Sequence, residues 1–171
     1  MSAEHARPLG EAEFAGLMEA CGPFEHSPLV AVATSGGADS LALALLAHDW
    51  AVRRGGRAIG LVVDHALRRE SATEAAEVAA WLGAAGIEPV VLRWHGPKPC
   101  GGVQAAARGA RYALLESWCR DAGVLHLLLG HQRDDQAETV LMRRRRRAGP
   151  GLAGMAPTVE TRDVRVTRPL L

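Results

Sequence analysis

Short apolar runs alternate with longer stretches of helix-forming residues along most of the chain. Runs of roughly four to eight apolar residues bounded by turn residues are typical of strands that are buried in a sheet. Such runs lie at residues 29–34, 58–64, 88–94, 125–129 and, more weakly, 164–167. The pattern therefore predicts about five strands.

The stretches between these runs have the spacing and composition of helices. They cover residues 40–54, 71–85, 104–122 and 135–144, and a further helix at about 10–20 is expected to pack outside the sheet. The alternation predicts an α/β fold, a doubly wound parallel sheet with helices on both faces, in which ligands bind beyond the carboxyl ends of the strands. We expect residues 1–26 to form a helical extension and residues 27–171 to form this domain.

The segment between the first strand and the next helix is rich in glycine and hydroxyl groups: Ser35, Gly36, Gly37, Ala38, Asp39 and Ser40. Glycines let the backbone approach a ligand, and the following helix directs unpaired N–H groups to the same place, so the segment is typical of a phosphate cradle. No lysine follows, so the Walker pattern is absent. Asp39 would repel phosphates unless a cation such as Mg²⁺ lay between them. The alternative is a glycine turn with Ser35 or Asp39 as the helix N-cap.

Residues 35–40 resemble the SGGxDS pyrophosphate loop (PP-loop) of the N-type ATP pyrophosphatases. Four further segments, at 63–68, 102–112, 130–139 and 168–171, occur in the order seen in tRNA(Ile)-lysidine synthetases. The resemblance covers all but roughly the first thirty residues. It implies that ATP is a substrate, that residues 35–40 bind its phosphates, and that Mg²⁺ is held partly by Asp39.

The resemblance also implies a reaction and its partners. The wobble cytidine of an isoleucine tRNA is adenylated and then joined to L-lysine to form lysidine, with release of pyrophosphate and AMP. Relatives of this kind continue beyond the position of Leu171 into tRNA-binding domains, which are absent from this sequence. A homodimer is left open.

Residues after two other predicted strands are expected at the same edge of the sheet. Asp64 and His65 follow one strand, and Gly130 and His131 follow another. The resemblance places them at the nucleotide. For His65, a helix cap or a hydrogen bond within a loop explains the residue equally well.

Arg108 and Arg111 are three residues apart and so share one face of a predicted helix. Guanidinium groups bind phosphate through permanently charged contacts, and the resemblance implies that this pair has a catalytic role, neutralising the phosphates of ATP or of the tRNA. The alternative is a solvated basic face.

Asp135 and Glu138 have the spacing of a capping box at the start of a helix. The same spacing puts both carboxylates on one face, where they could hold an ammonium group. The resemblance assigns them to the lysine substrate, and capping is compatible with that role.

Five consecutive arginines, Arg143 to Arg147, depart from the family pattern. They would point around the whole circumference of a helix, so they cannot all face solvent in a helix packed on a sheet. A contact to the anticodon arm and a solvated charge run both remain open.

Composition limits the location and the redox chemistry. The chain has 171 residues, 48% of them hydrophobic, and a net charge of +1. No apolar run approaches the roughly 20 residues that span a bilayer, so no membrane contact is expected. Cys21, Cys100 and Cys119 are too far apart in sequence for a paired metal motif, and a disulfide framework is not indicated. A cytoplasmic location follows as the default.

Three other functions stay open. A tRNA-thiolating relative shares the phosphate loop, but some such enzymes need paired cysteines. An adenylating enzyme that forms amides on a small metabolite would have no use for the arginine run. A nucleotide-binding module without turnover would bind ATP and release no AMP.

Overall fold

A computed structural model describes residues 8–132, 135 and 155–171. Its helices are α1 (Glu11–Ala20), α2 (Ala38–Arg53), α3 (Ser71–Ala84) and α4 (Val103–Asp121). Its strands are β1 (Leu29–Ala33), β2 (Arg57–Asp64), β3 (Glu88–Arg93), β4 (His126–Leu129), β5 (Thr158–Glu160) and β6 (Arg165–Thr167). The N-terminal helix and the five predicted strands are confirmed to within a few residues.

The strands of the described part form one sheet in the order β3-β2-β1-β4-β6-β5. All neighbours are parallel except β5 and β6, which are antiparallel. The predicted α/β class with a largely parallel sheet is therefore confirmed. The count of about five strands is corrected to six, because β5 was not predicted.

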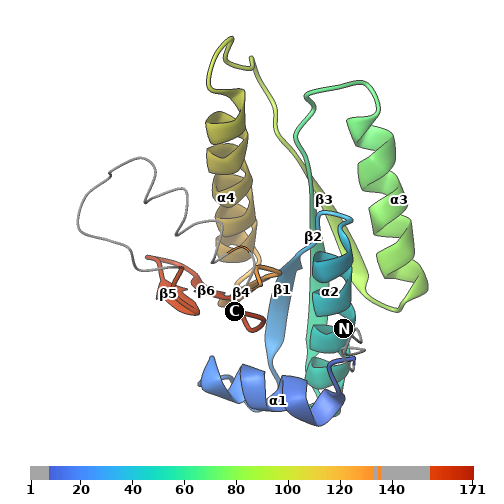
Figure 1. Cartoon of the computed structure of the whole chain (residues 1–171), viewed down its shortest axis with the longest axis vertical. Coiled ribbons are helices and arrows are strands. Elements are labelled where there is room, and N and C mark those ends of the chain that lie inside the picture. The colour runs from blue at the N-terminus through green and yellow to red at the C-terminus, as the bar shows by residue number, and fades with distance from the viewer. Residues whose placement is uncertain (1–7, 133–134, 136–154) are drawn as a thin grey trace, which may run out of the picture.

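Helices cover both faces of the sheet, as the alternation predicted (Figure 1). On one face, α1, α2 and α3 pack against alternate strand residues such as Val30, Val32 and Leu128. On the other face, α4 packs through Leu115 and Cys119 on the intervening strand residues. The α1 helix contributes Phe14 and Met18 to the first of these cores and contacts α2.

The contact between α3 and β2 is unusually close at Gly60. A Cβ atom built on Gly60 would lie 2.6 Å from Cδ1 of Leu82, a buried residue of α3. The absence of a side chain on this strand residue lets α3 sit directly on the sheet.

The parallel strands β1, β2 and β4 end at the same edge of the sheet. The helix that follows β1 lies on one face and the helix that precedes β4 lies on the other, so the edge between these strands is a topological switch point. The helix predicted at 135–144, apart from Asp135, and the run Arg143 to Arg147 lie outside the described residues. No helix of the described part is long and apolar enough to cross a membrane.

Candidate active site

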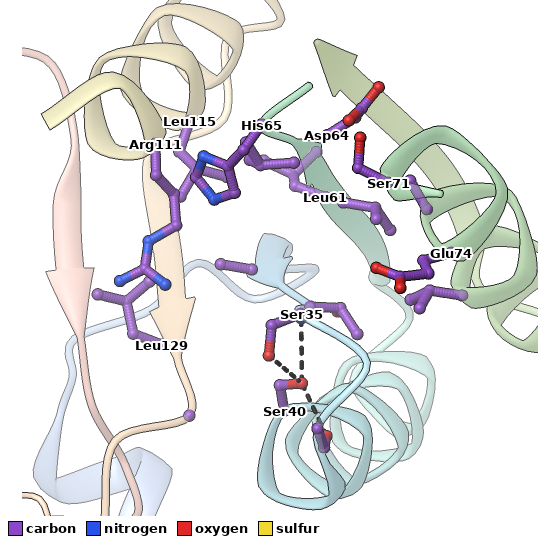
Figure 2. Close-up of a pocket in the computed structure, with 18 of the residues that line it drawn as sticks. Ser35, Ser40, Leu61, Asp64, His65, Ser71, Glu74, Arg111, Leu115 and Leu129 are labelled. Carbon is purple, nitrogen blue, oxygen red and sulfur yellow. Dashed lines mark hydrogen bonds between the residues drawn. The ribbon is translucent and has the colours of Figure 1, made fainter. Parts of the chain in front are cut away.

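A pocket of about 490 Å³ opens at the carboxyl edge of the sheet (Figure 2). The loops after β1, β2 and β4 line it, together with residues of α3 and α4. Three segments that are far apart in sequence therefore meet at one cavity, as the strand pattern predicted.

Hydrogen bonds hold the loop between β1 and α2 in a closed turn. The backbone N–H of Ser35 donates to Oγ of Ser40 at 3.1 Å, and the two hydroxyl oxygens are 3.2 Å apart. Oγ of Ser40 donates to the carbonyl of Gly37 at 2.9 Å. Gly36 has a φ of 85°, and a Cβ there would lie 2.8 Å from Cγ2 of Val78 on α3. The loop is thus fixed before any ligand arrives.

No side chain caps the start of α2. Gly37 occupies the N-cap position and makes no side-chain cap bond, so the alternative in which Ser35 or Asp39 caps the helix is wrong. The first N–H groups of α2 remain directed at the pocket edge, where an anion is favoured.

Gly130, directly after β4, lies against the start of α2. A Cβ on Gly130 would be 3.1 Å from Cα of Ser40 and 3.3 Å from its backbone nitrogen. A larger residue here would push the loop after β4 away from the loop after β1.

Gln132 joins two carboxylates that line the pocket. Its amide Nε2 donates to Oδ2 of Asp39 at 3.0 Å, and its backbone N–H donates to Oδ2 of Asp135 at 2.8 Å. Sequence reasoning did not single out Gln132, because an uncharged amide inside a motif carries little chemical signal by itself.

Asp64 is 3% exposed and holds the turn after β2. Its Oδ1 accepts the backbone N–H of Ala66 at 2.8 Å, and its Oδ2 lies 3.6 Å from Nε of Arg93. Burial acts to raise the pKa of Asp64, but the nearby hydroxyl of Ser71, the Ala66 N–H and Arg93 together outweigh it, so the pKa is lowered. Ala66 has a φ of 50°, a conformation that few residues other than glycine adopt. Asp64 thus holds the turn after β2 at the wall of the pocket.

Two histidines line the pocket with an unsatisfied nitrogen. Nδ1 of His65 and Nδ1 of His131 are buried and have no hydrogen-bond partner among the described residues. Burial lowers the pKa of both, and Arg111 lowers the pKa of His65 further while Arg168 does the same for His131. Both rings therefore favour the neutral form at pH 7.

Arg111 and Arg108 differ in position although they share α4. Arg111 lines the pocket, and its buried Nε has no partner in the described part. Figure 2 shows its side chain reaching from α4 towards Leu129. Arg108 is exposed, its Nη2 lies 3.5 Å from the hydroxyl of Tyr112, and it does not line the pocket.

Most of the predicted site residues meet in this pocket. Those that line it are Ser35, Gly37, Asp39, Ser40, Asp64, His65, Arg111, Gly130, His131 and Asp135. Gly36 and Ala38 belong to the same loop without lining the cavity, and Glu138 lies outside the described residues.

Three residues for which the sequence predicted no role lie in the wall of the pocket or act on a residue of that wall. Arg68 and Glu74 form an ion pair at 2.8 Å in its wall. Arg168 is 8% exposed, donates to the carbonyl of Ala156 at 2.9 Å and acts on His131 through space. Arg68 and Arg168 fall within the segments that resemble the family, but these contacts form only when the chain is folded, so the sequence did not reveal them.

A parallel α/β sheet with a glycine-rich loop between β1 and α2, at a switch point, defines the class of nucleotide-binding α/β domains. Within this class, the chain belongs to the PP-loop domain family, whose model matches residues 11–171.

Similar proteins carry one recurring name. A tRNA(Ile)-lysidine synthase of Rhodopseudomonas palustris is 48% identical over 151 residues, which cover 86% of this chain and 44% of the relative. Synthases of the same name from a Bradyrhizobium strain and from Salinispora tropica are 46% and 51% identical, over 96% and 83% of this chain and 46% and 43% of their own lengths. The chain thus spans less than half of the length of these relatives.

Among solved structures, the U34-tRNA thiolase NcsA from Methanococcus maripaludis, with its [4Fe-4S] cluster, is similar with a TM-score of 0.78. The similarity covers 93% of this chain and 58% of NcsA at 19% sequence identity. At this identity the likeness concerns the fold.

Proposed function

We propose that this chain is the ATP-using part of a tRNA(Ile)-lysidine synthase. The observation that carries the proposal is the link that Gln132 makes between two carboxylates of the pocket, Asp39 beside the phosphate loop and Asp135. The PP-loop family supports ATP as a substrate, and the names of the relatives support isoleucine tRNA as the acceptor. L-lysine as the second substrate rests on the resemblance.

Asp39 has the chemistry to share a magnesium ion with ATP. Its side chain is exposed, and one carboxylate oxygen receives Gln132 while the other has no hydrogen-bond partner among the described residues. No group of three or more His, Cys, Asp or Glu residues in the described ranges forms a metal site. Mg²⁺ is commonly held by one or two carboxylates together with phosphates, so the residues fit a shared ion that neutralises phosphate charge.

The first half of the reaction transfers the adenylyl group of ATP to the tRNA. The phosphates lie on residues 35–40, and Arg111, with Arg108 nearby, offsets their negative charge. The C2 carbonyl oxygen of the wobble cytidine attacks the α-phosphate, forming a P–O bond as the bond to pyrophosphate breaks. Positioning and electrostatic stabilisation supply the catalysis, since no residue of the chain is covalently modified.

The second half replaces AMP by lysine. Asp135, together with Glu138, holds one ammonium group of L-lysine, and the other amine attacks the activated carbon and expels AMP. Asp135 already accepts a backbone N–H through Oδ2, which fixes the carboxylate in place. Asp135 can therefore accept the backbone N–H of Gln132 and bind the ammonium group of lysine at the same time.

The positions of the cysteines favour a lysidine-forming ligase over a tRNA-thiolating enzyme. Cys21 and Cys119 are buried, and burial raises the pKa of both thiols, that of Cys119 to about 12. Cys100 is exposed in the loop before α4. Two of the three thiols are therefore poor nucleophiles in separate parts of the fold.

The test is release of AMP from α-labelled ATP in the presence of an unmodified isoleucine tRNA with a cytidine wobble base, with and without lysine. The proposal expects AMP only when both tRNA and lysine are present. AMP without a lysine requirement would overturn the identity of the amine and leave adenylation standing. Binding of ATP without any AMP, in this chain and in a longer chain that includes the remaining length of the relatives, would overturn the ligase.

A further inference from the structure

Lys98 is the only lysine among the 20 lysine and arginine residues of the chain. It lies in the loop between β3 and α4, half-buried, with Nζ 3.8 Å from the centre of the Trp94 ring. The same Nζ donates a hydrogen bond to the carbonyl of Trp94 at 2.7 Å. All other basic side chains of the chain are arginines. The one lysine stands where its compact ammonium group contacts both the ring and the backbone carbonyl of Trp94.

The ammonium group of Lys98 can donate further hydrogen bonds. An ammonium carries three N–H donors, and the Trp94 carbonyl takes one of them. No carboxylate of the described residues lies within 4.0 Å of Lys98, and the nearby Asp64 is engaged by Arg93 and Ala66. The charge of Lys98 is therefore oriented without being neutralised.

Trp94 connects Lys98 to the pocket. Its backbone N–H donates to the carbonyl of Asp64 at 2.8 Å, and its ring meets His65 edge-on with the ring centres 6.4 Å apart. His65 lines the pocket and also feels the charges of Lys98 and Arg111. Lys98, Trp94 and the neutral ring of His65 thus lead from the loop before α4 into the cavity.

Lys98 lies on the side of the pocket away from the phosphate loop. The loop follows β1, whereas Lys98 follows β3, two strands across the sheet and so about 10 Å away at the usual strand spacing. The phosphates of a nucleotide on residues 35–40 have their own N–H donors. The charge of Lys98 is left for a second anionic ligand.

We propose that Lys98, held on the Trp94 ring, binds a phosphodiester oxygen of the RNA strand whose base enters the pocket beside His65. The inference rests on the RNA substrate proposed above. A point charge with two free N–H groups suits a non-bridging phosphate oxygen, and contacts of this kind position the strand without reading its sequence. The phosphate chemistry alone would also suit ATP, so the test separates the two sources.

The experiment compares Lys98→Gln, Lys98→Arg and the wild-type protein, with Arg57→Gln as a matched control. Glutamine keeps an N–H donor on a side chain one atom shorter and removes the charge together with its contact to the Trp94 ring. Arg57 begins β2 at the opposite edge of the sheet and pairs with Glu88 on the surface, so its loss changes the net charge equally. The dissociation constant of the wobble-cytidine isoleucine tRNA is measured over a range of salt concentrations, and that of ATP is measured without RNA.

Lys98→Gln is expected to weaken RNA binding about fivefold and to reduce the magnitude of the salt slope by about 0.7 to 0.9, the value of one phosphate contact. ATP affinity should stay within twofold, Lys98→Arg should bind RNA more tightly than Lys98→Gln, and Arg57→Gln should behave as wild type.

Equal RNA affinities and slopes for wild type and Lys98→Gln would overturn the inference, even if the wild type releases AMP with tRNA and lysine. A loss of ATP affinity with unchanged RNA affinity would assign Lys98 to the nucleotide and also overturn it. A wild-type protein that binds RNA but releases no AMP would count against the proposed ligase and not against Lys98, and one that binds no RNA would overturn both.

Discussion

At the scale of single residues, Arg108 and Arg111 show how three positions along one helix change the role of a side chain. Arg111 lies in the pocket with a buried, unpartnered Nε, whereas Arg108 is exposed beside Tyr112. Arg111→Ala should lower kcat/KM by about 100-fold, as removal of one donor to a transition-state anion does. Arg108→Ala should lower it less, and each should change the free energy of unfolding by no more than about 1 kcal/mol.

AMP release and urea denaturation check this pair together. Arg120→Ala is the control, because Arg120 is an exposed arginine at the far end of the same helix and pairs with Asp121. If Arg111→Ala or Arg108→Ala lost stability and activity in parallel, the arginine would be structural and its proposed role would fail.

Gly130 gives a second prediction at this scale. Gly130→Ala should weaken ATP binding, because its methyl group would meet the backbone of Ser40 at about 3.1 Å and displace the phosphate loop. Gly16→Ala is the control, since a Cβ on this helical glycine has no neighbour within 4 Å and alanine favours a helix by about 0.5–1 kcal/mol. ATP affinity measured by calorimetry should fall for Gly130→Ala alone, and an unchanged affinity would contradict the contact.

The placement of site residues was predictable where the signal is local. The glycines and hydroxyl groups of residues 35–40 predicted the loop, because the contacts that shape it lie within this short segment. Gln132 and Arg168 lie within segments that resemble the family, but no role was predicted for either, because their partners Asp39 and Ala156 lie on other segments. Asp64 was predicted at the nucleotide, and the structure shows that its oxygens hold Ala66 and face Arg93.

At the scale of elements, the absence of a side chain on Gly60 lets α3 pack closely against β2. Gly60→Ala should destabilise the protein by about 1–3 kcal/mol, since a Cβ would lie 2.6 Å from Leu82 and overpack the interface. Gly83→Ala, the next residue of α3, has open space around its Cβ and should leave stability equal or higher. Thermal denaturation of both variants checks the prediction. Equal melting temperatures would show that α3 shifts without cost.

The hydrophobic pattern predicted the helices and strands except for a strand that forms only through its hydrogen bonds to a neighbouring strand. Strands β1 and β4 were found because their apolar runs are buried on both faces. Strand β5 has three residues, two of them exposed, and exists through its antiparallel pairing with β6. Its sequence gives no apolar run to detect, so a count from hydrophobic runs ends at five.

At the scale of the whole molecule, three histidines couple stability to pH: His126 is buried, and His65 and His131 are half-buried. Burial lowers the pKa of His65, His126 and His131, although Glu25 opposes this at His126. Their contribution is fully present above the unfolded value of about 6.5 and is lost as pH falls from there towards the folded values, because the unfolded chain then binds protons that the folded chain does not. Each histidine should contribute a slope of at most about 1.4 kcal/mol per pH unit.

Urea denaturation at pH 7.5, 6.5 and 5.5 measures this effect. His126→Gln should give a shallower decline, since His126 is 2% exposed and its Nε2 lies 3.0 Å from Glu25, a bond that an amide can also make. A free energy of unfolding that does not change from pH 7.5 to 5.5 would contradict the neutral state of these rings.

The single lysine has a consequence for chemical labelling of the chain. Besides the terminal amine, Lys98 is the only primary amine in the 171 residues, so an acylating reagent has one side-chain target. That target lies on the Trp94 ring, beside a histidine of the pocket. A fluorophore attached there without mutagenesis would stand next to the cavity, and its emission would report whatever enters.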